Sequence, residues 1–86
     1  MTREGFVELM GEEDYSSGWE GCNVFSGLEI IRKYIPGAGI EGADHDIVYS
    51  VDIDKLVEAG ITEEDTMKLR GLNWMVEDND YLACHV

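Results

Sequence analysis

Basic residues are scarce in this 86-residue chain, in which six Lys and Arg stand against 19 Asp and Glu, a formal net charge of −13. We therefore expect no direct nucleic-acid ligand, because phosphates would be repelled. An anionic membrane surface is disfavoured for the same reason. The negative electrostatic field of the chain instead suits a partner rich in Lys and Arg. The alternative interpretation is that the surface acidity serves only solubility.

Long apolar runs are missing as well. No stretch approaches the roughly 18 apolar residues of a membrane span, and residues 1–11 lack the basic and apolar regions of a signal peptide. We therefore expect a cytoplasmic protein. Cysteine is limited to Cys22 and Cys84, which in this setting are expected to be reduced thiols packed as small apolar groups, with a disulfide as the alternative.

Catalytic and metal motifs are also lacking. No Ser or Cys lies in a recognisable nucleophile context, so a hydrolase using His45 is only a minor hypothesis. Residues 37–42 spell G-x-G-x-x-G, but they follow a predicted helix, whereas the dinucleotide fingerprint follows a strand. The acidic turn at 78–80 lacks the ligand pattern of an EF-hand. Cys22, His45, Cys84 and His85 lack paired C-x-x-C spacing, which argues against zinc. We expect no enzyme activity, cofactor or metal.

The hydrophobic fraction of 44% is typical of a folded protein, and the length supports a single domain over residues 1–86. Residues 6–10 fit a strand or a helical turn equally well. Ser26 and Glu29 have the spacing of a capping box, which predicts a helix starting there. Pro36 ends this helix near Tyr34. One apolar face is expected from Val24, Leu28, Ile31 and Ile35.

Further along, residues 46–52 predict a strand with Ile47, Tyr49 and Val51 on one face. Asp52 can cap a short helix that stops at Gly60. The next helix is expected to begin at the Thr62 cap and to turn Leu69 and Leu72 inward.

The tail predicts a hairpin of Trp74–Glu77 and Tyr81–Val86 around the turn formers at 78–80. Together these elements predict an α+β fold, with a small antiparallel sheet and two to three helices packed on one face.

Acidic and aromatic residues supply the candidate binding site. The glycine-rich loop 11–21 places two aromatic side chains among acids, a composition typical of binding hot spots, although Trp19 packing onto the core is the alternative. Three acidic clusters, at 12–14, 63–65 and 77–80, could share one face, where exposed and fairly rigid carboxylates would imitate a row of phosphates. The partner-binding candidates are Glu12, Glu13, Asp14, Tyr15, Trp19, Glu63, Glu64, Asp65, Glu77, Asp78 and Asp80.

Residues 44–86 resemble small proteins of phages and mobile elements, in which a capped TEED helix leads to an L-x-W strand, an acidic turn and an aromatic strand. In size and acidity the chain also resembles phage-encoded anti-CRISPR proteins and other DNA-mimicking inhibitors. That resemblance implies an inhibitor occluding the basic nucleic-acid channel of a host complex, such as a CRISPR effector. The alternative is a small regulatory or assembly module for an ordinary protein partner, or a homodimer paired through the hairpin edge.

Overall fold

The computed structural model describes residues 1–11, 21–44, 47–78 and 80–85, and the side chains of Asp44 and His85 are not described. The fold is α+β, as the sequence predicted. The elements in chain order are α1 (Arg3–Met10), α2 (Asn23–Tyr34), β1 (Gly42–Asp44), β2 (Ile47–Asp52), α3 (Ile53–Glu58), α4 (Glu63–Gly71), β3 (Trp74–Glu77) and β4 (Tyr81–His85).

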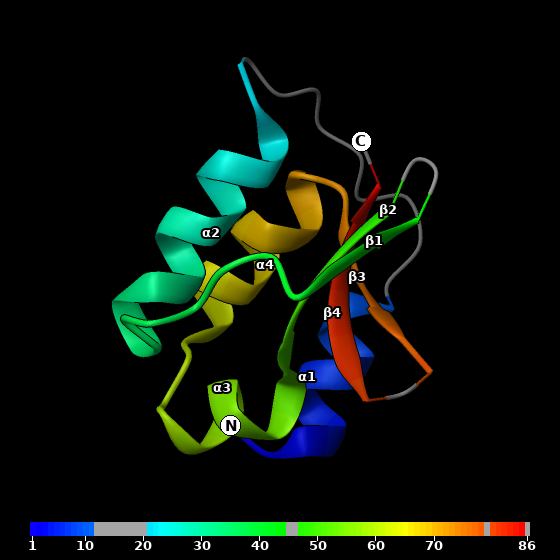
Figure 1. The fold of residues 1–86 in the computed structure, drawn as a ribbon. Coiled ribbons are helices and arrows are strands. Elements are labelled where there is room, and N and C mark those ends of the chain that lie inside the picture. The colour runs from blue at the N-terminus through cyan, green and yellow to red at the C-terminus, as the bar shows by residue number, and fades with distance from the viewer. Residues whose placement is uncertain (12–20, 45–46, 79, 86) are drawn as a thin grey trace.

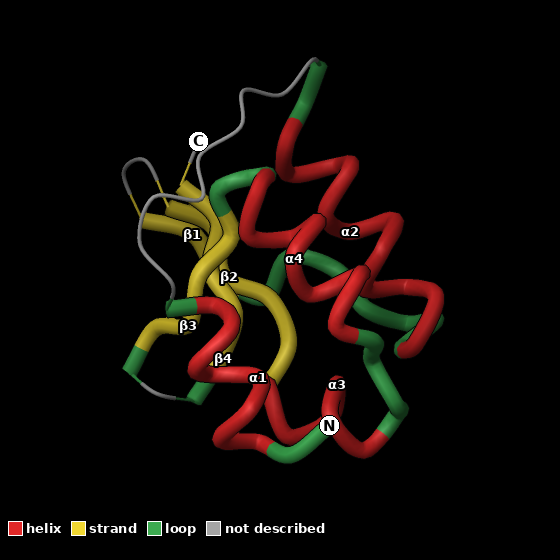
Figure 2. Tube along the Cα trace, turned by 180° about the vertical axis from the view of Figure 1, so that it is seen from behind, coloured by secondary structure: helices red, strands yellow, loops and turns green. Residues whose placement is uncertain are grey.

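The four strands form one antiparallel sheet in the order β1-β2-β4-β3. The predicted C-terminal hairpin is confirmed, with Trp74 opposite Cys84 and Glu77 opposite Tyr81. Helices α2 and α4 lie side by side next to the sheet, while α1 contacts α4, α3 and the edge strand β3 (Figures 1 and 2). The described residues thus contain four helices rather than two or three.

The hydrophobic core lies between the sheet and the helices. Each of the four helices and three of the strands place fully or almost fully buried side chains in it: Phe6, Ile31, Val51, Ile53, Leu56, Leu69, Trp74, Leu82 and Cys84. Because Leu82 and Cys84 are two positions apart on β4, their side chains point to the same, helix-covered face of the sheet.

The short apolar segment at 6–10 is helical. Thr2 is its N-cap, and the Thr2 hydroxyl oxygen accepts a hydrogen bond from the Gly5 amide at 3.0 Å. Phe6 and Met10, four residues apart, lie on the same side of α1 and are both buried. This cap decides between the two alternatives that the apolar spacing alone left open.

The predicted start of α2 is wrong. The helix begins at Asn23 with Cys22 as its N-cap, so Ser26 lies within it and forms no capping box with Glu29. The reason is a long-range contact of the buried Asn23 side chain. Its Nδ2 donates to the Leu72 carbonyl at 2.9 Å and contacts Cys84 Sγ at 3.1 Å. The predicted end at Tyr34 is confirmed, as is the packing of Val24, Leu28, Ile31 and Ile35 on the core.

The predicted alternation of β2 is also wrong. A register shift between Tyr49 and Asp52 inserts an extra residue on this strand. As a result Val48 and Val51 both pack on the core, whereas the Tyr49 ring contacts Tyr81 away from it.

The predicted caps of the next two helices are confirmed. Asp52 accepts from the Asp54 amide at 2.8 Å, and Thr62 accepts from the Asp65 amide at 3.1 Å. Gly60 adopts φ +89°, the left-handed conformation expected after α3. Leu69 is fully buried and Leu72 packs against the core, as predicted.

Cys22 and Cys84 are both reduced thiols. Cys84 is buried in the core as expected, and burial raises the pKa of its thiol to about 11. Cys22 is exposed at the start of α2, so the expectation that it would be packed is wrong.

Candidate binding surface

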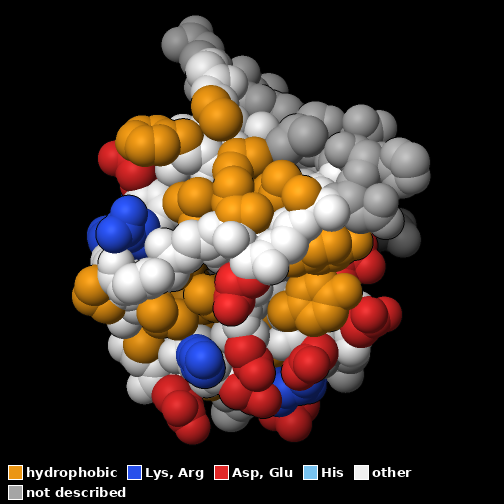
Figure 3. Space-filling model, in the orientation of Figure 1, with side chains coloured by type: hydrophobic (Ala, Val, Ile, Leu, Met, Phe, Trp, Pro, Cys, Tyr) orange, Lys and Arg blue, Asp and Glu red, His pale blue; other side chains and the backbone are white. Residues whose placement is uncertain are grey.

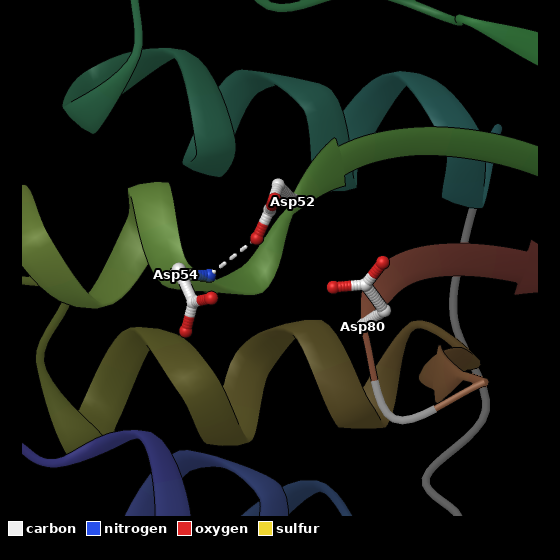
Figure 4. A group of neighbouring side chains, drawn as sticks. All are labelled: Asp52, Asp54 and Asp80. Carbon is white, nitrogen blue, oxygen red and sulfur yellow. Dashed lines mark hydrogen bonds between the residues drawn. The ribbon is translucent and has the colours of Figure 1, made fainter.

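Asp52 and Asp54, two positions apart in the sequence, lie close to Asp80 of the C-terminal hairpin (Figure 4). Asp52 ends β2, Asp54 lies in the first turn of α3, and Asp80 follows the turn of the β3–β4 hairpin. One carboxylate oxygen from each lies within 4.8 Å of the others. We call Asp52, Asp54 and Asp80 the aspartate cluster.

Backbone hydrogen bonds hold this cluster in place. The Ile53 amide donates to the Asp80 carbonyl at 3.0 Å, which fastens the hairpin turn to the start of α3. Within the turn, Asp78 adopts φ +52° and the Asp80 amide donates to the Glu77 carbonyl at 3.0 Å. The positions of Asp52 and Asp80 are therefore set by main-chain geometry as well as by their side-chain conformations.

The cluster is only partly neutralised. Arg3 Nε donates to Asp54 Oδ1 at 2.8 Å, and both side chains are partly exposed. Asp52 uses one oxygen to cap α3, and Asp80 is exposed. Three carboxylates are oxygen ligands of the kind that Ca²⁺ accepts, but exposed acids commonly gather without an ion, so we interpret the cluster as a negatively charged surface.

A groove lined by two tyrosines adjoins the cluster. The rings of Tyr49 and Tyr81 meet edge to face, with centroids 5.4 Å apart and planes at 79°. The groove encloses about 350 Å³, and we call it the tyrosine groove; its lining residues are Glu41, Gly42, Tyr49, Ser50, Asp52 and Tyr81. Asp52 thus belongs to both the groove and the aspartate cluster.

The Tyr81 hydroxyl is anchored within the hairpin, because it donates to Asp78 Oδ2 at 3.2 Å. Partial burial raises the pKa of Tyr81, and the hydrogen bond to Asp78 and the neighbouring negative charges raise it further. The phenol is therefore neutral at physiological pH, with its ring fixed at one wall of the groove.

Acidic side chains gather at one end of the molecule. In the space-filling view they lie mostly at the lower end, where Figure 1 places α1, α3 and the turn between β3 and β4 (Figure 3). A few Lys and Arg side chains lie among them. The surface around the aspartate cluster is therefore acidic, with scattered positive charges.

The structure brings only part of the predicted site together. Asp78 and Asp80 are exposed at the hairpin turn, as expected, and Glu77 is half-buried opposite Tyr81. Glu63 and Glu64 are exposed in the first turn of α4, but neither belongs to the aspartate cluster. Glu12, Glu13, Asp14, Tyr15 and Trp19 lie outside the described residues.

Asp65 is not the exposed acid that the sequence predicted. Its side chain is 9% exposed and forms an ion pair with Lys33 Nζ at 2.9 Å, and Tyr34 donates its hydroxyl hydrogen to the same carboxylate. These contacts join α2 to α4, which gives Asp65 a structural role.

The sequence interpretation missed several residues of the aspartate cluster and the tyrosine groove, Glu41 and Tyr81 among them. Asp52 was predicted only as a helix cap, Tyr49 was placed on the core face of its strand, and Asp54 was given no role. The bulge in β2 and the hydrogen bond from Ile53 to Asp80 create the site, and neither has a local sequence signal. Asp80 alone among the three aspartates was a predicted site residue.

Mutual repulsion within the aspartate cluster predicts a stabilising substitution. We expect Asp80→Asn to raise the melting temperature by a few °C at most at low salt, since like charges at a surface repel weakly. Salt near 1 M should remove most of the gain. Glu29→Gln on α2 is the matched control, because Glu29 precedes Arg32 and Lys33 by one helical turn and gains nothing by losing its charge. Equal gains in both variants would show that general acidity, and not the cluster, is relieved.

Of the motifs considered for catalysis or cofactor binding, the G-x-G-x-x-G segment contributes Glu41 and Gly42 to the lining of the tyrosine groove. The segment follows α2, as the sequence indicated, and it leads into β1, which the sequence did not predict. His45 and the side chain of His85 lie outside the described part of the chain.

Within the described residues, none of the helices has the length and apolar character needed to cross a membrane. No protein-family model, curated protein or solved structure matches the chain. Its function must therefore be inferred from its own residues.

Proposed function

We propose that this protein is a non-catalytic inhibitor whose acidic surface docks on the Lys- and Arg-rich, nucleic-acid-binding surface of another protein or complex. The observation that carries the proposal is the aspartate cluster with the neighbouring Asp78. Bound there, the protein excludes nucleic acid both by its volume and by its charge.

The way in which the carboxylates are held supports this role. Asp52 is fixed as a helix cap, and the main chain of Asp80 is held by hydrogen bonds on both its amide and its carbonyl group. Asp78 is held by the Tyr81 hydroxyl. Charges that are already ordered lose little conformational entropy on binding, so they can replace phosphates, which are themselves held along a backbone.

The net charge of −13 extends this local pattern to the whole molecule. Such a field accelerates association with a basic partner and makes association dependent on ionic strength. A host defence complex such as a CRISPR effector in the cytoplasm offers a basic channel of the required kind, and it is the partner class that we propose to test first.

A charge-matched pair of variants tests the proposal. Asp78→Asn with Asp80→Lys changes the net charge by +3, as does Glu8→Gln with Glu29→Lys on α1 and α2. We expect the first pair to weaken inhibition of DNA binding by about tenfold or more, because a like charge is placed against the basic channel. The control pair should weaken it far less. The measurement is release of labelled target DNA from CRISPR effector complexes at increasing inhibitor concentration.

Ionic strength provides an independent measurement on the wild-type protein. Its affinity for an inhibited complex should fall steadily as salt is raised from low to physiological concentration. Affinity that does not respond to salt, or equal losses in the two charge-matched pairs, would contradict phosphate mimicry.

The sheet order favours one alternative. Strands β1 and β3 lie at the two edges of the sheet among the described residues, and an edge strand can pair with a partner strand or with a second copy of the chain. The protein would then be a regulatory or assembly module whose acidity serves solubility. Analytical ultracentrifugation showing a dimer, or recovery of a partner without any nucleic-acid function, would favour this alternative.

A further inference from the structure

We propose that the tyrosine groove is the receptor for an arginine side chain of the basic partner. This inference rests on the proposed function and goes beyond it, because it assigns a site, a chemical group and a preference for arginine over lysine. It uses Tyr49, Tyr81, Glu41 and Asp52, of which none was identified as a site residue from the sequence.

The two rings supply the first part of the argument. Tyr49 and Tyr81 stand nearly perpendicular, with ring centroids 5.4 Å apart, and both line the groove. A cation within about 6 Å of a ring centroid is attracted by the electron-rich face. A planar guanidinium can also stack on that face, which an ammonium group cannot do.

Two carboxylates supply the second part. Asp52 and Glu41 line the same groove as the rings, and Glu41 is exposed. A guanidinium carries five N–H donors in a rigid fork that matches carboxylate oxygens. The groove therefore combines the two kinds of contact that recognise arginine, whereas its negative charge repels a phosphate-bearing ligand.

The groove is also preformed. The Ser50 hydroxyl donates to the Gly39 carbonyl at 2.8 Å, and the Glu41 amide donates to the Tyr49 carbonyl at 2.8 Å, so the segment before β1 is fastened to β2. On the opposite side, the hydrogen bond from Tyr81 to Asp78 fixes the second ring. A site that is ordered before binding loses less entropy when a side chain enters.

Arginine is favoured over lysine because the groove is open to solvent. The ammonium group of lysine is strongly hydrated and retains its water at an open site, whereas a guanidinium is weakly hydrated and leaves water more readily. The contact between the cation and an aromatic ring at an exposed site corresponds to about a threefold gain in affinity.

A titration with small probes tests this assignment directly. N-acetyl-arginine amide and N-acetyl-lysine amide are added separately, at constant ionic strength, to isotope-labelled protein followed by NMR. We expect saturable chemical-shift changes on addition of the arginine probe at residues 41, 42, 49, 50, 52 and 81. The lysine probe should bind about threefold more weakly. Equal binding of the two probes, or shifts that spread over the acidic surface without saturating, would overturn the assignment.

Variants separate the rings from the charges. Tyr49→Leu with Tyr81→Leu removes both aromatic faces and should abolish the preference for arginine. Phe25→Leu is the matched control, because Phe25 is 62% exposed on α2, away from the groove, and it should leave the titration unchanged. An unchanged titration in the double variant would refute a groove built on these rings.

A second variant keeps the assignment testable if the tyrosine variants do not fold. A Cβ at Gly42 would contact the Tyr49 ring at 3.4 Å, so Gly42→Leu is expected to fill the groove while keeping both tyrosines. Loss of arginine binding in a folded Gly42→Leu protein supports the assignment, and retained binding opposes it.

The inference and the proposed function can fail separately. If the tyrosine variants release DNA as well as the wild type does, while Asp78→Asn with Asp80→Lys does not, then docking by charge stands and the arginine receptor is wrong. If the aspartate variants remain fully inhibitory, the proposed function is wrong, and the probe titration still decides whether the groove binds arginine.

Discussion

Replacing Gly27 with alanine is expected to lower the free energy of unfolding by about 3 kcal/mol, the combined effect of overpacking and of a disturbed buried hydrogen bond. A Cβ at this position of α2 would overlap Nε1 and Cε2 of Trp74 and lie 2.8 Å from Cδ1. The indole is 1% exposed and cannot move aside without disturbing the core. Its Nε1 also donates to the Asn23 carbonyl at 3.1 Å, and displacement would stretch that bond.

Helix propensity acts in the opposite direction but is smaller. Alanine is favoured over glycine within a helix by about 1 kcal/mol, whereas overpacking a core costs about 1–3 kcal/mol and an unsatisfied buried polar group about 1–3 kcal/mol more. A domain of this size has a total stability of about 4–13 kcal/mol. The substitution therefore removes a large part of the stability.

Urea denaturation measures the effect, with Gly37→Ala as the matched control because a Cβ there meets no atom within 4 Å. In a Trp74→Phe background, where the indole nitrogen is missing, Gly27→Ala should cost much less than in the wild type. This non-additivity identifies the clash as the cause. If Gly27→Ala were as stable as Gly37→Ala, close packing of α2 on β3 would be contradicted.

The predicted features that are confirmed follow from local rules. The caps at Asp52 and Thr62, the left-handed Gly60 and the hairpin around 78–80 each depend on residues within a few positions of one another. The same holds for the end of α2 before Pro36. Such features can be predicted because their physical causes lie in the neighbouring sequence.

The features that were missed depend on contacts between distant residues. Asn23 starts α2 because its side chain binds Leu72 and Cys84, which are 49 and 61 positions away. Asp65 is buried because Lys33 and Tyr34 reach it from another helix. Neither the hydrophobic periodicity nor a capping pattern in the sequence predicts these contacts.

The candidate site likewise combines a feature that the local sequence predicts with features that depend on distant contacts. Asp80 was predicted because acids at a hairpin turn are exposed. Its grouping with Asp52 and Asp54 needed the Ile53–Asp80 hydrogen bond, and the tyrosine groove needed the bulge in β2. The acidic character of the surface could thus be predicted, whereas the arrangement of its carboxylates could not.

Replacing Asp65 with alanine is the second substitution expected to have a large effect, lowering the free energy of unfolding by about 1–3 kcal/mol. The carboxylate accepts the Tyr34 hydroxyl hydrogen and pairs with Lys33, and Lys68 Nζ lies 3.9 Å from its other oxygen. The change leaves the Tyr34 hydroxyl without its acceptor in a partly buried setting. Thermal and urea denaturation measure the loss. Asp65→Asn is the informative comparison, because it keeps an acceptor for Tyr34 and removes only the charge.

The dependence of this loss on pH distinguishes a charge effect from a packing effect. The Tyr34 hydrogen bond holds the pKa of Asp65 below its ordinary value, and the Lys33 hydrogen bond lowers it further. A carboxyl group whose pKa is lower in the folded state stabilises the protein fully above its unfolded value, about 3.9, and loses that contribution as pH falls through the folded value. The stability difference between wild type and Asp65→Asn should therefore be constant from pH 7 to about 5 and shrink at lower pH.

Measuring a difference between two proteins is essential here, because the other carboxylates titrate in the same range and, in a chain of charge −13, their protonation also relieves repulsion. Tyr34→Phe removes the largest cause of the lowered pKa of Asp65, so in that background the difference should be smaller at pH 7 and its decrease should be complete at a higher pH. A difference that stays constant from pH 7 to about 3 would mean that the negative charge of Asp65 contributes nothing to holding α2 against α4.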